Sequence, residues 1–319
     1  MPLGQLSKAQ IQSGFAVLVK LKAALESGEK NRDKLEKLSN QFYTAIPHAV
    51  GRTRLPILRD EEIVQQKMDM LAVLGDIEIA LNLTKGQTSH EERVGDTIEK
   101  DNILDQRYDS LHCDLTYVEP DTEEFALVQK YATQTQGVRK PKITGLWRVD
   151  REGSTQRFAE HDKLGNRKLL WHGTNIAVVA AILNSGLRIM PHSGGRVGRG
   201  IYFASENGKS SSYVGCSGDT GVMFLGEAVL GKEHWIHIDD PSLRCAPPGY
   251  ESIIAKGQYE PDPKDDVEIE LDGHTVVVPL GKPISQPPWK HSRFINSEYL
   301  VYKESQAKLR YAMTMTFSR

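Results

Sequence analysis

Cysteine is scarce in this sequence, with 3 in 319 residues. Cys113, Cys216 and Cys245 lie far apart, and none has the CxxC spacing of a zinc ribbon or a thioredoxin-like site. A disulfide framework is therefore excluded as the basis of folding. We expect the protein to work in a reducing, intracellular compartment.

Long apolar runs and an excess of positive charge are also lacking. The N-terminus, MPLGQLSKAQ, has no apolar signal core, and no run reaches the roughly 18 apolar residues of a membrane span. We therefore predict no contact with a membrane. Lys and Arg number 40 against 42 Asp and Glu, a net charge of −2. Strong DNA binding rests on neutralising phosphates, so we expect a segment outside this chain or a partner to carry it.

The two common nucleotide cradles are missing as well. After Gly198 and Gly200, the third glycine of a dinucleotide fingerprint would fall on Phe203. The same residue breaks the P-loop that Gly208-Lys209-Ser210 would end. There is no HExxH motif, and His172 has no His or Cys at ligand spacing, so we predict no metal.

The first part of the chain has the periodicity of helices. A face of Ile11, Phe15, Leu18, Leu21 and Leu25 follows a capping box at Ser7 and Gln10 and ends at Ser27-Gly28. A second helix places Leu35, Leu38, Phe42 and Ile46 on one side and ends at Pro47. A third begins near Asp60, with Gly75 as a kink or break, and carries Ile63, Met70, Leu71, Leu74, Ile77 and Leu81.

The period changes after the polar stretch 85–105. Alternation from Leu111 to Tyr117 predicts a strand, and 122–133, 175–185 and 206–213 look helical. Further strands are predicted at 143–149, 168–173, 200–205, 222–230, 251–257, 267–271, 275–280, 298–303 and 310–317, with a type I′ hairpin at Asp272-Gly273. We predict an α+β protein: a helical bundle over 1–90, a linker over 91–106 and an antiparallel-rich domain over 107–319.

Three segments are unusual for an ordinary core. They are LLWHGT (169–174), GRGIYFA (198–204) followed by Lys209-Ser210 and Tyr213, and NSEYLVY (296–302). In this order they resemble the signature of the poly(ADP-ribose) polymerase family. The resemblance covers nearly the whole chain, and MPHSGGRVGRGIYFAS (190–205) is most similar to the third, mono-ADP-ribosylating branch of the DNA-damage-dependent group.

The resemblance implies an organisation and a setting. Residues 1–90 would be a regulatory helical domain that caps an NAD⁺ site, and the remainder a split-sheet transferase domain. The chain would be a fragment that lacks DNA-sensing modules and belongs to a nuclear protein of DNA repair. Its acceptors would be proteins, such as itself, histones and repair proteins, and also DNA ends.

The chemistry of NAD⁺ explains why one carboxylate would be enough. Nicotinamide leaves as a neutral molecule, so the oxocarbenium-like sugar forms without a general acid. Glu298 would bind the nicotinamide ribose, stabilise the cation and orient the nucleophile. An isolated glutamate that opens a strand usually just faces solvent; only its place in the whole motif overrides that interpretation.

The other site residues come from the same resemblance, since each alone would be an ordinary structural residue. His172 would bind the adenosine ribose, Gly173 and Ser210 the carboxamide, and Tyr202 and Tyr213 the two faces of the pyridinium ring. Catalysis is assigned to Glu298, His172 and Tyr202. Residues expected to line the NAD⁺ site are His172, Gly173, Thr174, Arg188, Tyr202, Lys209, Ser210 and Tyr213.

Two departures from the family bear on the outcome of the reaction. Val178 and Ala181 stand where the founding member has asparagine and glycine, which alters the adenine side. Arg196, in a short loop, replaces hydrophobic acceptor-site residues and favours transfer of single units. Two alternatives stay open: a weak NAD⁺ or ADP-ribose binding module, and an NAD⁺ glycohydrolase.

Overall fold

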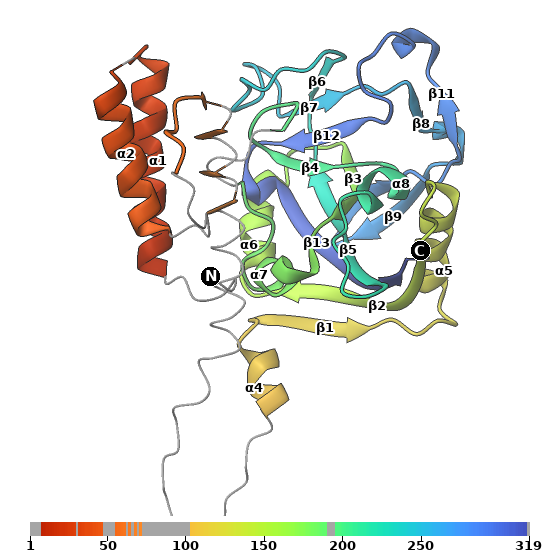
Figure 1. Ribbon diagram of the computed structural model, residues 1–319. Helices are drawn as coiled ribbons and strands as arrows, with labels where there is room; N and C mark the ends of the chain where they lie inside the picture. Colours follow the sequence, from red (N-terminus) through yellow and green to blue (C-terminus); the bar gives the residue numbers. More distant parts are fainter. Residues whose placement is uncertain are drawn as a thin grey trace, which may run out of the picture. The chain divides into compact units, whose positions relative to one another are not determined.

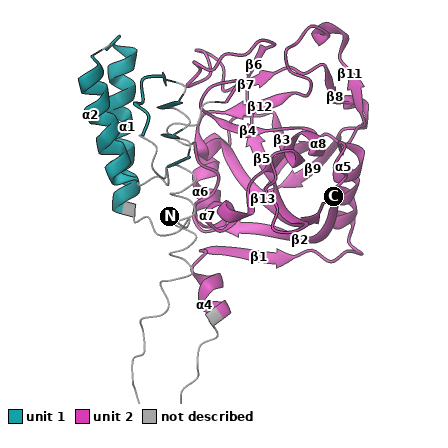
Figure 2. Ribbon diagram, in the orientation of Figure 1, with its two compact units in different colours: residues 1–99, 190–194 teal, residues 100–189, 195–319 magenta. Residues whose placement is uncertain are grey.

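The computed structural model describes residues 8–29, 31–46, 55–61, 63–64, 67–68, 70–71, 103–189 and 195–317. The chain forms two compact units, coloured separately in Figure 2. The first comprises residues 1–99 with 190–194, and the second comprises 100–189 with 195–319. The end of the predicted linker, 103–106, is helical instead, because α4 (Ile103–Asp109) begins there. Its sequence, ILDQRYD, contains the good helix formers Leu, Gln and Arg.

The first unit contains two of the predicted helices, α1 (Lys8–Glu26) and α2 (Arg32–Ala45). Gly28 ends α1 with φ 77°, and its N–H donates to Leu25 O at 2.8 Å. Asn31 begins α2 by accepting hydrogen bonds from two backbone N–H groups. Most residues of the predicted apolar faces of α1 and α2 are buried in one core. This core includes Leu18, Leu21, Leu35, Phe42 and, from the segment after α2, Leu58.

A third helix follows Asp60, whose carboxylate accepts the Ile63 N–H at 3.2 Å. Its buried face holds Val64, Met68 and Leu71. The prediction that Ile63 belongs to this face is wrong: its side chain is 43% exposed, because positions 64, 68 and 71 follow the helical period and 63 does not. Several residues of the predicted helices lie outside the described part of the chain: Ser7, Pro47, Leu74, Gly75, Ile77 and Leu81.

The second unit is built on a seven-stranded sheet in the order β1-β2-β13-β5-β3-β10-β9 (Figure 1). All neighbours are antiparallel except β10 and β3. Its strands are β1 (Cys113–Tyr117), β2 (Lys142–Arg151), β3 (Arg167–Gly173), β5 (Thr220–Val229), β9 (Val267–Leu271), β10 (His274–Val278) and β13 (Ala307–Thr316). The type I′ turn is confirmed, since Asp272 and Gly273 between β9 and β10 have φ 50° and 76°.

A second sheet has four strands in the order β4-β12-β7-β6, and a two-stranded ribbon pairs β11 with β8. The bounds are β4 (Ile201–Phe203), β6 (Glu233–Ile236), β7 (Ser252–Ala255), β8 (Tyr259–Pro261), β11 (Pro283–Ser285) and β12 (Glu298–Val301). The expected α+β class with a split, mainly antiparallel sheet is confirmed. The sequence did not predict β6, β8 or β11, which have three or four residues each and lack the apolar runs that mark β4, β7 and β12.

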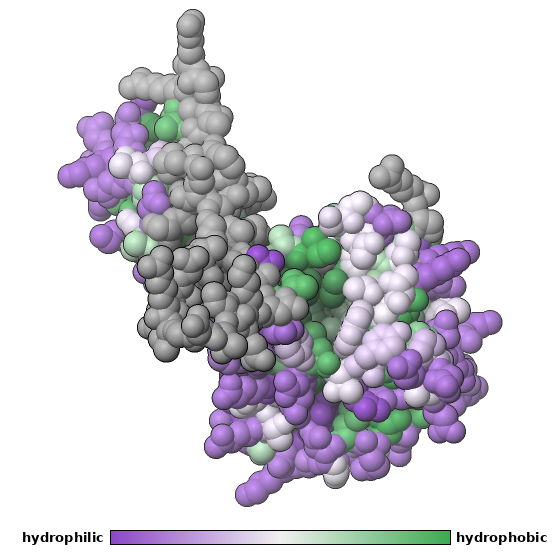
Figure 3. Space-filling view, turned by 90° about the horizontal axis from the view of Figure 1, so that it is seen from below, coloured by the Kyte–Doolittle hydropathy of each residue, from purple (hydrophilic) through white to green (hydrophobic). Residues whose placement is uncertain are grey.

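Short helices cover the sheets: α5 (Glu123–Gln134), α6 (Ser154–Phe158), α7 (Val179–Ser185), α8 (Asn207–Ser211) and the single 3-10 turns η1 (Ala159–His161), η2 (Ile176–Val178), η3 (Pro263–Asp265), η4 (Pro287–Trp289) and η5 (Glu304–Gln306). Tyr131 of α5 is fully buried, and its hydroxyl is within hydrogen-bond distance of Leu169 O (3.1 Å) and Ser205 O (3.0 Å). This helix is therefore fastened to segments of both sheets. Seen from below, the described surface is largely hydrophilic, with apolar areas between (Figure 3).

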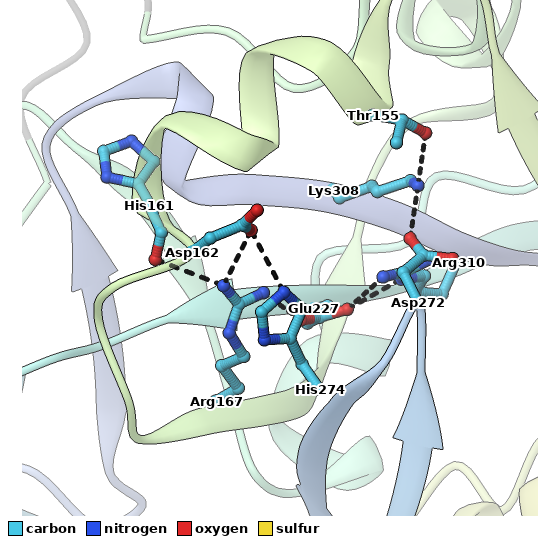
Figure 4. Close-up of polar contacts among 9 residues, drawn as sticks. All are labelled: Thr155, His161, Asp162, Arg167, Glu227, Asp272, His274, Lys308 and Arg310. Atoms are coloured by element: carbon cyan, nitrogen blue, oxygen red, sulfur yellow. Dashed lines mark hydrogen bonds and ion pairs between the residues drawn. The ribbon is translucent and has the colours of Figure 1, made fainter.

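A network of charged side chains, several of them buried, links strands of the large sheet (Figure 4). Glu227 of β5 is fully buried and pairs with Arg167 of β3 at 2.9 Å and with Arg310 of β13. Asp272, in the β9–β10 turn, pairs with Arg310 and with Lys308, both at 2.7 Å. These contacts tie three neighbouring strands and the hairpin together. Glu227, with two arginine partners, is compensated despite its burial.

Candidate active site

The two sheets meet where β3 and β4 end. Trp171 and Ala204 exchange backbone hydrogen bonds of 2.8 and 3.0 Å. This junction sets His172, the next residue of β3, close to Tyr202 of β4. In the second sheet, β12 lies between β4 and β7, with Leu300 opposite Tyr202. Segments more than a hundred residues apart are thereby brought to one place.

His172 is held by a backbone contact. Its Nδ1 lies 2.9 Å from Tyr202 O, and a carbonyl can only accept, so Nδ1 carries the proton. Part of the ring remains accessible, yet burial lowers the pKa of His172, against the opposing effect of this hydrogen bond. The imidazole is therefore neutral at physiological pH, and Nε2 is available as an acceptor.

Gly173 lies directly beneath α8. A Cβ at this position would meet Ser210 O at 1.9 Å, so only glycine fits. The hydroxyl of Ser210 donates to Trp171 O at 3.0 Å. A hydroxyl that has used its hydrogen still offers lone pairs, so Ser210 can accept one further hydrogen bond. Thr174 follows at the end of β3 and is 9% exposed, and its carbonyl accepts the Gly215 N–H at 3.2 Å.

The two predicted tyrosines are in different environments. Tyr202 is partly buried; its hydroxyl donates to Gly198 O at 2.6 Å and accepts the Val197 N–H at 3.1 Å. Burial raises the pKa of Tyr202, with smaller contributions from nearby Glu298 and Tyr213. Tyr213 is 62% exposed. One ring is thus fixed in orientation by the loop before β4, and the other faces solvent.

Glu298 opens β12 and is 4% exposed. Its Oε1 lies 2.7 Å from Nζ of Lys209 in α8, which also lies 5.4 Å from the centre of the Tyr213 ring. Burial acts to lower the pKa of Lys209, but the hydrogen bond and charge of Glu298 outweigh it and raise that pKa. The structure therefore presents an ion pair between the predicted carboxylate and a lysine beside one predicted ring.

Arg196 reaches the same region from the loop before β4. Its guanidinium pairs with Asp239, donates to Arg293 O at 2.8 Å and lies 4.1 Å from the centre of the Phe294 ring. Asp239 raises the pKa of Arg196 by a hydrogen bond, and the charge of Glu298 adds to this effect. Sequence reasoning missed Asp239 and Phe294, because nothing in their local pattern distinguishes them from ordinary loop residues.

The remaining predicted residues lie toward α7. Arg188 follows that helix and is half-buried, whereas Val178 and Ala181 are buried and contribute to packing. Hydrogen bonds, close contacts and electrostatic effects connect His172, Gly173, Tyr202, Lys209, Ser210, Tyr213 and Glu298. The roles assigned to all these side chains stay predictions.

The described residues show neither a metal cluster nor a membrane-spanning helix. No group of three or more His, Cys, Asp or Glu side chains there could hold a metal ion. No helix in the described ranges is long and apolar enough to cross a membrane.

The sequence matches two family models. One is described as the poly(ADP-ribose) polymerase catalytic domain and matches residues 122–317; the other, the regulatory domain of the same family, matches residues 1–108. The protein mono-ADP-ribosyltransferase PARP3 of Mus musculus is 53% identical over 318 residues, and that of Homo sapiens is 51% identical. Each match covers 98% of this chain and 59% of the relative. Poly [ADP-ribose] polymerase 1 of Xenopus laevis is 37% identical over 328 residues, which cover all of this chain and 31% of that protein.

Proposed function

The chain belongs to the poly(ADP-ribose) polymerase family, and on this premise we propose that it transfers ADP-ribose, mainly as single units, from NAD⁺ to protein side chains. Enzymes of this family use NAD⁺ as a substrate. Two relatives about half identical to this chain carry the name mono-ADP-ribosyltransferase, which supports single transfers. The chain spans 59% of those relatives' length.

The observation that carries the proposal is the buried ion pair of Glu298 and Lys209. Departure of neutral nicotinamide leaves positive charge on the ribose, and a buried carboxylate stabilises that charge without reorganising water. Lys209 fixes the position of Glu298 Oε1 through their contact of 2.7 Å. A ribose hydroxyl that donates to Glu298 then shares the carboxylate with Lys209 or displaces it.

The neighbouring groups match the rest of NAD⁺. The neutral His172 offers Nε2 to a ribose hydroxyl, since Nδ1–H is already donated to Tyr202 O. Ser210 offers lone pairs to the carboxamide N–H beside Gly173, because its own hydrogen points to Trp171 O. Tyr202 and Tyr213 flank the charged pyridinium, which gains from stacking and cation–π attraction.

Family membership supports our proposal for the wider setting of the reaction. The acceptors are the protein itself, histones and repair proteins, with DNA ends as a second class. The reaction needs no metal, takes place in the nucleus and responds to DNA breaks sensed outside this chain. The first unit, which matches the regulatory model, controls access of NAD⁺ to Glu298 and its neighbours.

Incubation with NAD⁺ labelled in its adenosine part tests the proposal. Label on protein is expected, whereas free ADP-ribose alone would indicate a glycohydrolase and no turnover a binding module. Glu298→Gln should still bind NAD⁺ but lose roughly a hundredfold or more in transfer rate, as expected for a group that stabilises transition-state charge. Glu268→Gln, at an exposed glutamate of β9, should leave the rate unchanged. Full activity in the Glu298 variant would refute the mechanism.

A further inference from the structure

Three aromatic side chains gather at the free edge of the four-stranded sheet. Trp235 lies on β6, the last strand of that sheet, and is 55% exposed. Trp289 of η4 meets it with ring centres 6.2 Å apart and planes at 89°. His237 lies 6.0 Å from Trp289. Figure 1 shows β6 and the segment between β11 and β12 at the same end of the unit. We refer to Trp235, His237 and Trp289 as the aromatic edge.

Three basic residues lie against the aromatic edge or next to it in the chain. Nζ of Lys256 lies 4.9 Å from the centre of the Trp235 ring. Lys290 and Arg293 follow Trp289 and are exposed, and the Arg293 N–H donates to His237 O at 3.0 Å. The two segments that carry the rings are therefore tied together, and the Lys256 ammonium lies beside one of the rings.

The carboxylates near the aromatic edge are engaged by other groups. Glu233 accepts hydrogen bonds from Trp235 Nε1 at 2.7 Å and from Asn166 Nδ2 at 2.9 Å. Asp239 pairs with Arg196. Trp235 and Asn166 are neutral donors and do not offset the carboxylate of Glu233. The three basic residues Lys256, Lys290 and Arg293 nevertheless outnumber this one carboxylate, although the whole chain has a net charge of −2. An affinity for polyanions would thus come from this surface and not from the protein's overall charge.

We propose that the aromatic edge binds single-stranded nucleic acid, with bases on Trp235 and Trp289 and phosphates beside Lys256, Lys290 and Arg293. Trp235 is exposed, Trp289 is partly exposed, and a cation lies beside the Trp235 ring. Aromatic rings interleaved with cations are what a strand of unpaired bases and phosphates requires. A duplex keeps its bases stacked and cannot use the rings. An acidic peptide would use only the cations, and a methylated lysine would be repelled by them.

The aromatic edge adjoins the region of Glu298 through Arg196, which donates to Arg293 O and lies within electrostatic reach of that glutamate. A strand held here lies near the candidate active site. Binding itself does not depend on catalysis, so failure of this inference and failure of the proposed transfer activity are separate results.

Fluorescence anisotropy of a labelled oligothymidylate, titrated with the 319-residue chain, tests the inference. Trp235→Ala and Trp289→Ala should each weaken binding roughly tenfold, the usual loss for one stacking ring, while Trp235→Phe keeps most of the affinity. Lys290→Gln and Arg293→Gln should each lower the slope of log affinity against log salt by about 0.7. Tyr117→Ala is the matched control: Tyr117 is 44% exposed on β1 and meets Trp147 edge-on at 5.7 Å.

The inference is supported if binding is saturable, weakens in the variants of Trp235, Trp289, Lys290 and Arg293, and is unchanged in the Tyr117 variant. Circular dichroism must show that all variants are folded. It is overturned if the oligonucleotide does not bind, or if both tryptophan-to-alanine variants bind as the parent does. Equal affinity for a duplex of the same length would overturn it too, as would equally effective competition by polyglutamate or by a trimethyllysine peptide.

Discussion

Buried carboxylates are stabilised differently in two parts of the second unit. Within the large sheet, Glu227 lies between two arginines. Near the junction of the sheets, Glu206, which precedes α8, is 6% exposed, and its Oε1 has no hydrogen-bond partner among the described residues. Burial, and to a smaller extent the charge of Glu260, raise the pKa of Glu206 to about 7. Glu227 has two cationic partners, whereas Glu206 has none in the described part of the chain and holds a proton up to neutral pH.

The difference teaches that burial alone does not set the charge of a carboxyl group. Glu260, beside Glu206, accepts hydrogen bonds from Ser205 Oγ at 2.6 Å and Tyr299 Oη at 2.5 Å, both from neutral donors. Burial and nearby carboxylates, including Glu260, also raise the pKa of Asp266 to about 6, although Lys168 acts to lower it. Glu206 and Asp266 thus show that a buried carboxyl group with little compensation from cations binds a proton more tightly.

The largest effect on stability is expected at Glu227. Replacing it by glutamine removes the negative charge between Arg167 and Arg310 and should cost about 3–5 kcal/mol in the free energy of unfolding. Denaturant titration of Glu227→Gln measures this loss, and Glu268→Gln is the exposed control. A loss below about 1 kcal/mol would mean that the two arginines find other partners, and the contrast with Glu206 would disappear.

A smaller effect, with a defined pH dependence, is expected at Glu206. Its folded-state pKa of about 7 lies above the ordinary value of 4.5, so its neutral form favours the folded state. The contribution is fully present below pH 4.5 and is lost as pH rises toward 7, by up to about 3 kcal/mol. Glu206→Gln should therefore become stabilising relative to the parent as pH rises. A difference in unfolding free energy that is the same at pH 5 and pH 8 would contradict this.

The smallest effect is expected at an exposed pair. Arg148 is 58% exposed at its side chain and pairs with Glu124, which also accepts a hydrogen bond from Tyr311 Oη at 2.8 Å. Burial acts to raise the pKa of Glu124, but these two hydrogen bonds lower it overall. A double-mutant cycle with Arg148→Ala and Glu124→Gln should give a coupling below about 1 kcal/mol. A coupling as large as the loss at Glu227 would show that exposure does not weaken such pairs.

The sequence predicted the helices and turns that are determined by residues close together in the chain. The faces of α1 and α2 follow from apolar spacing, and the β9–β10 turn follows from Asp272-Gly273, since a type I′ turn needs two positive φ angles. The motif residues of the site were recognisable because they lie in short, ordered segments. Their placement beside one another follows from pairing between distant strands, such as Leu300 with Tyr202.

The remainder depends on contacts that no local pattern encodes. Lys209 and Glu298 are 89 positions apart, as their residue numbers show, and their ion pair requires both sheets to be formed. In the sequence, Glu227 is a single polar residue inside an apolar strand. Its partners Arg167 and Arg310 come from neighbouring strands, so the pairing exists only in the folded sheet. The aromatic edge was missed for the same reason, since Trp235 and Trp289 come from separate short segments.

The strand orders have a consequence for biosynthesis. In the large sheet β13 is inserted between β2 and β5, and in the smaller one β12 is inserted between β4 and β7. Both central places are filled by residues 298–316, long after their neighbours have left the ribosome. A nascent chain that stops short of them exposes unpaired strand edges in both sheets and lacks Glu298. Translation must therefore pass these residues before the enzyme can consume NAD⁺, and a truncated product is expected to be inert and prone to aggregate.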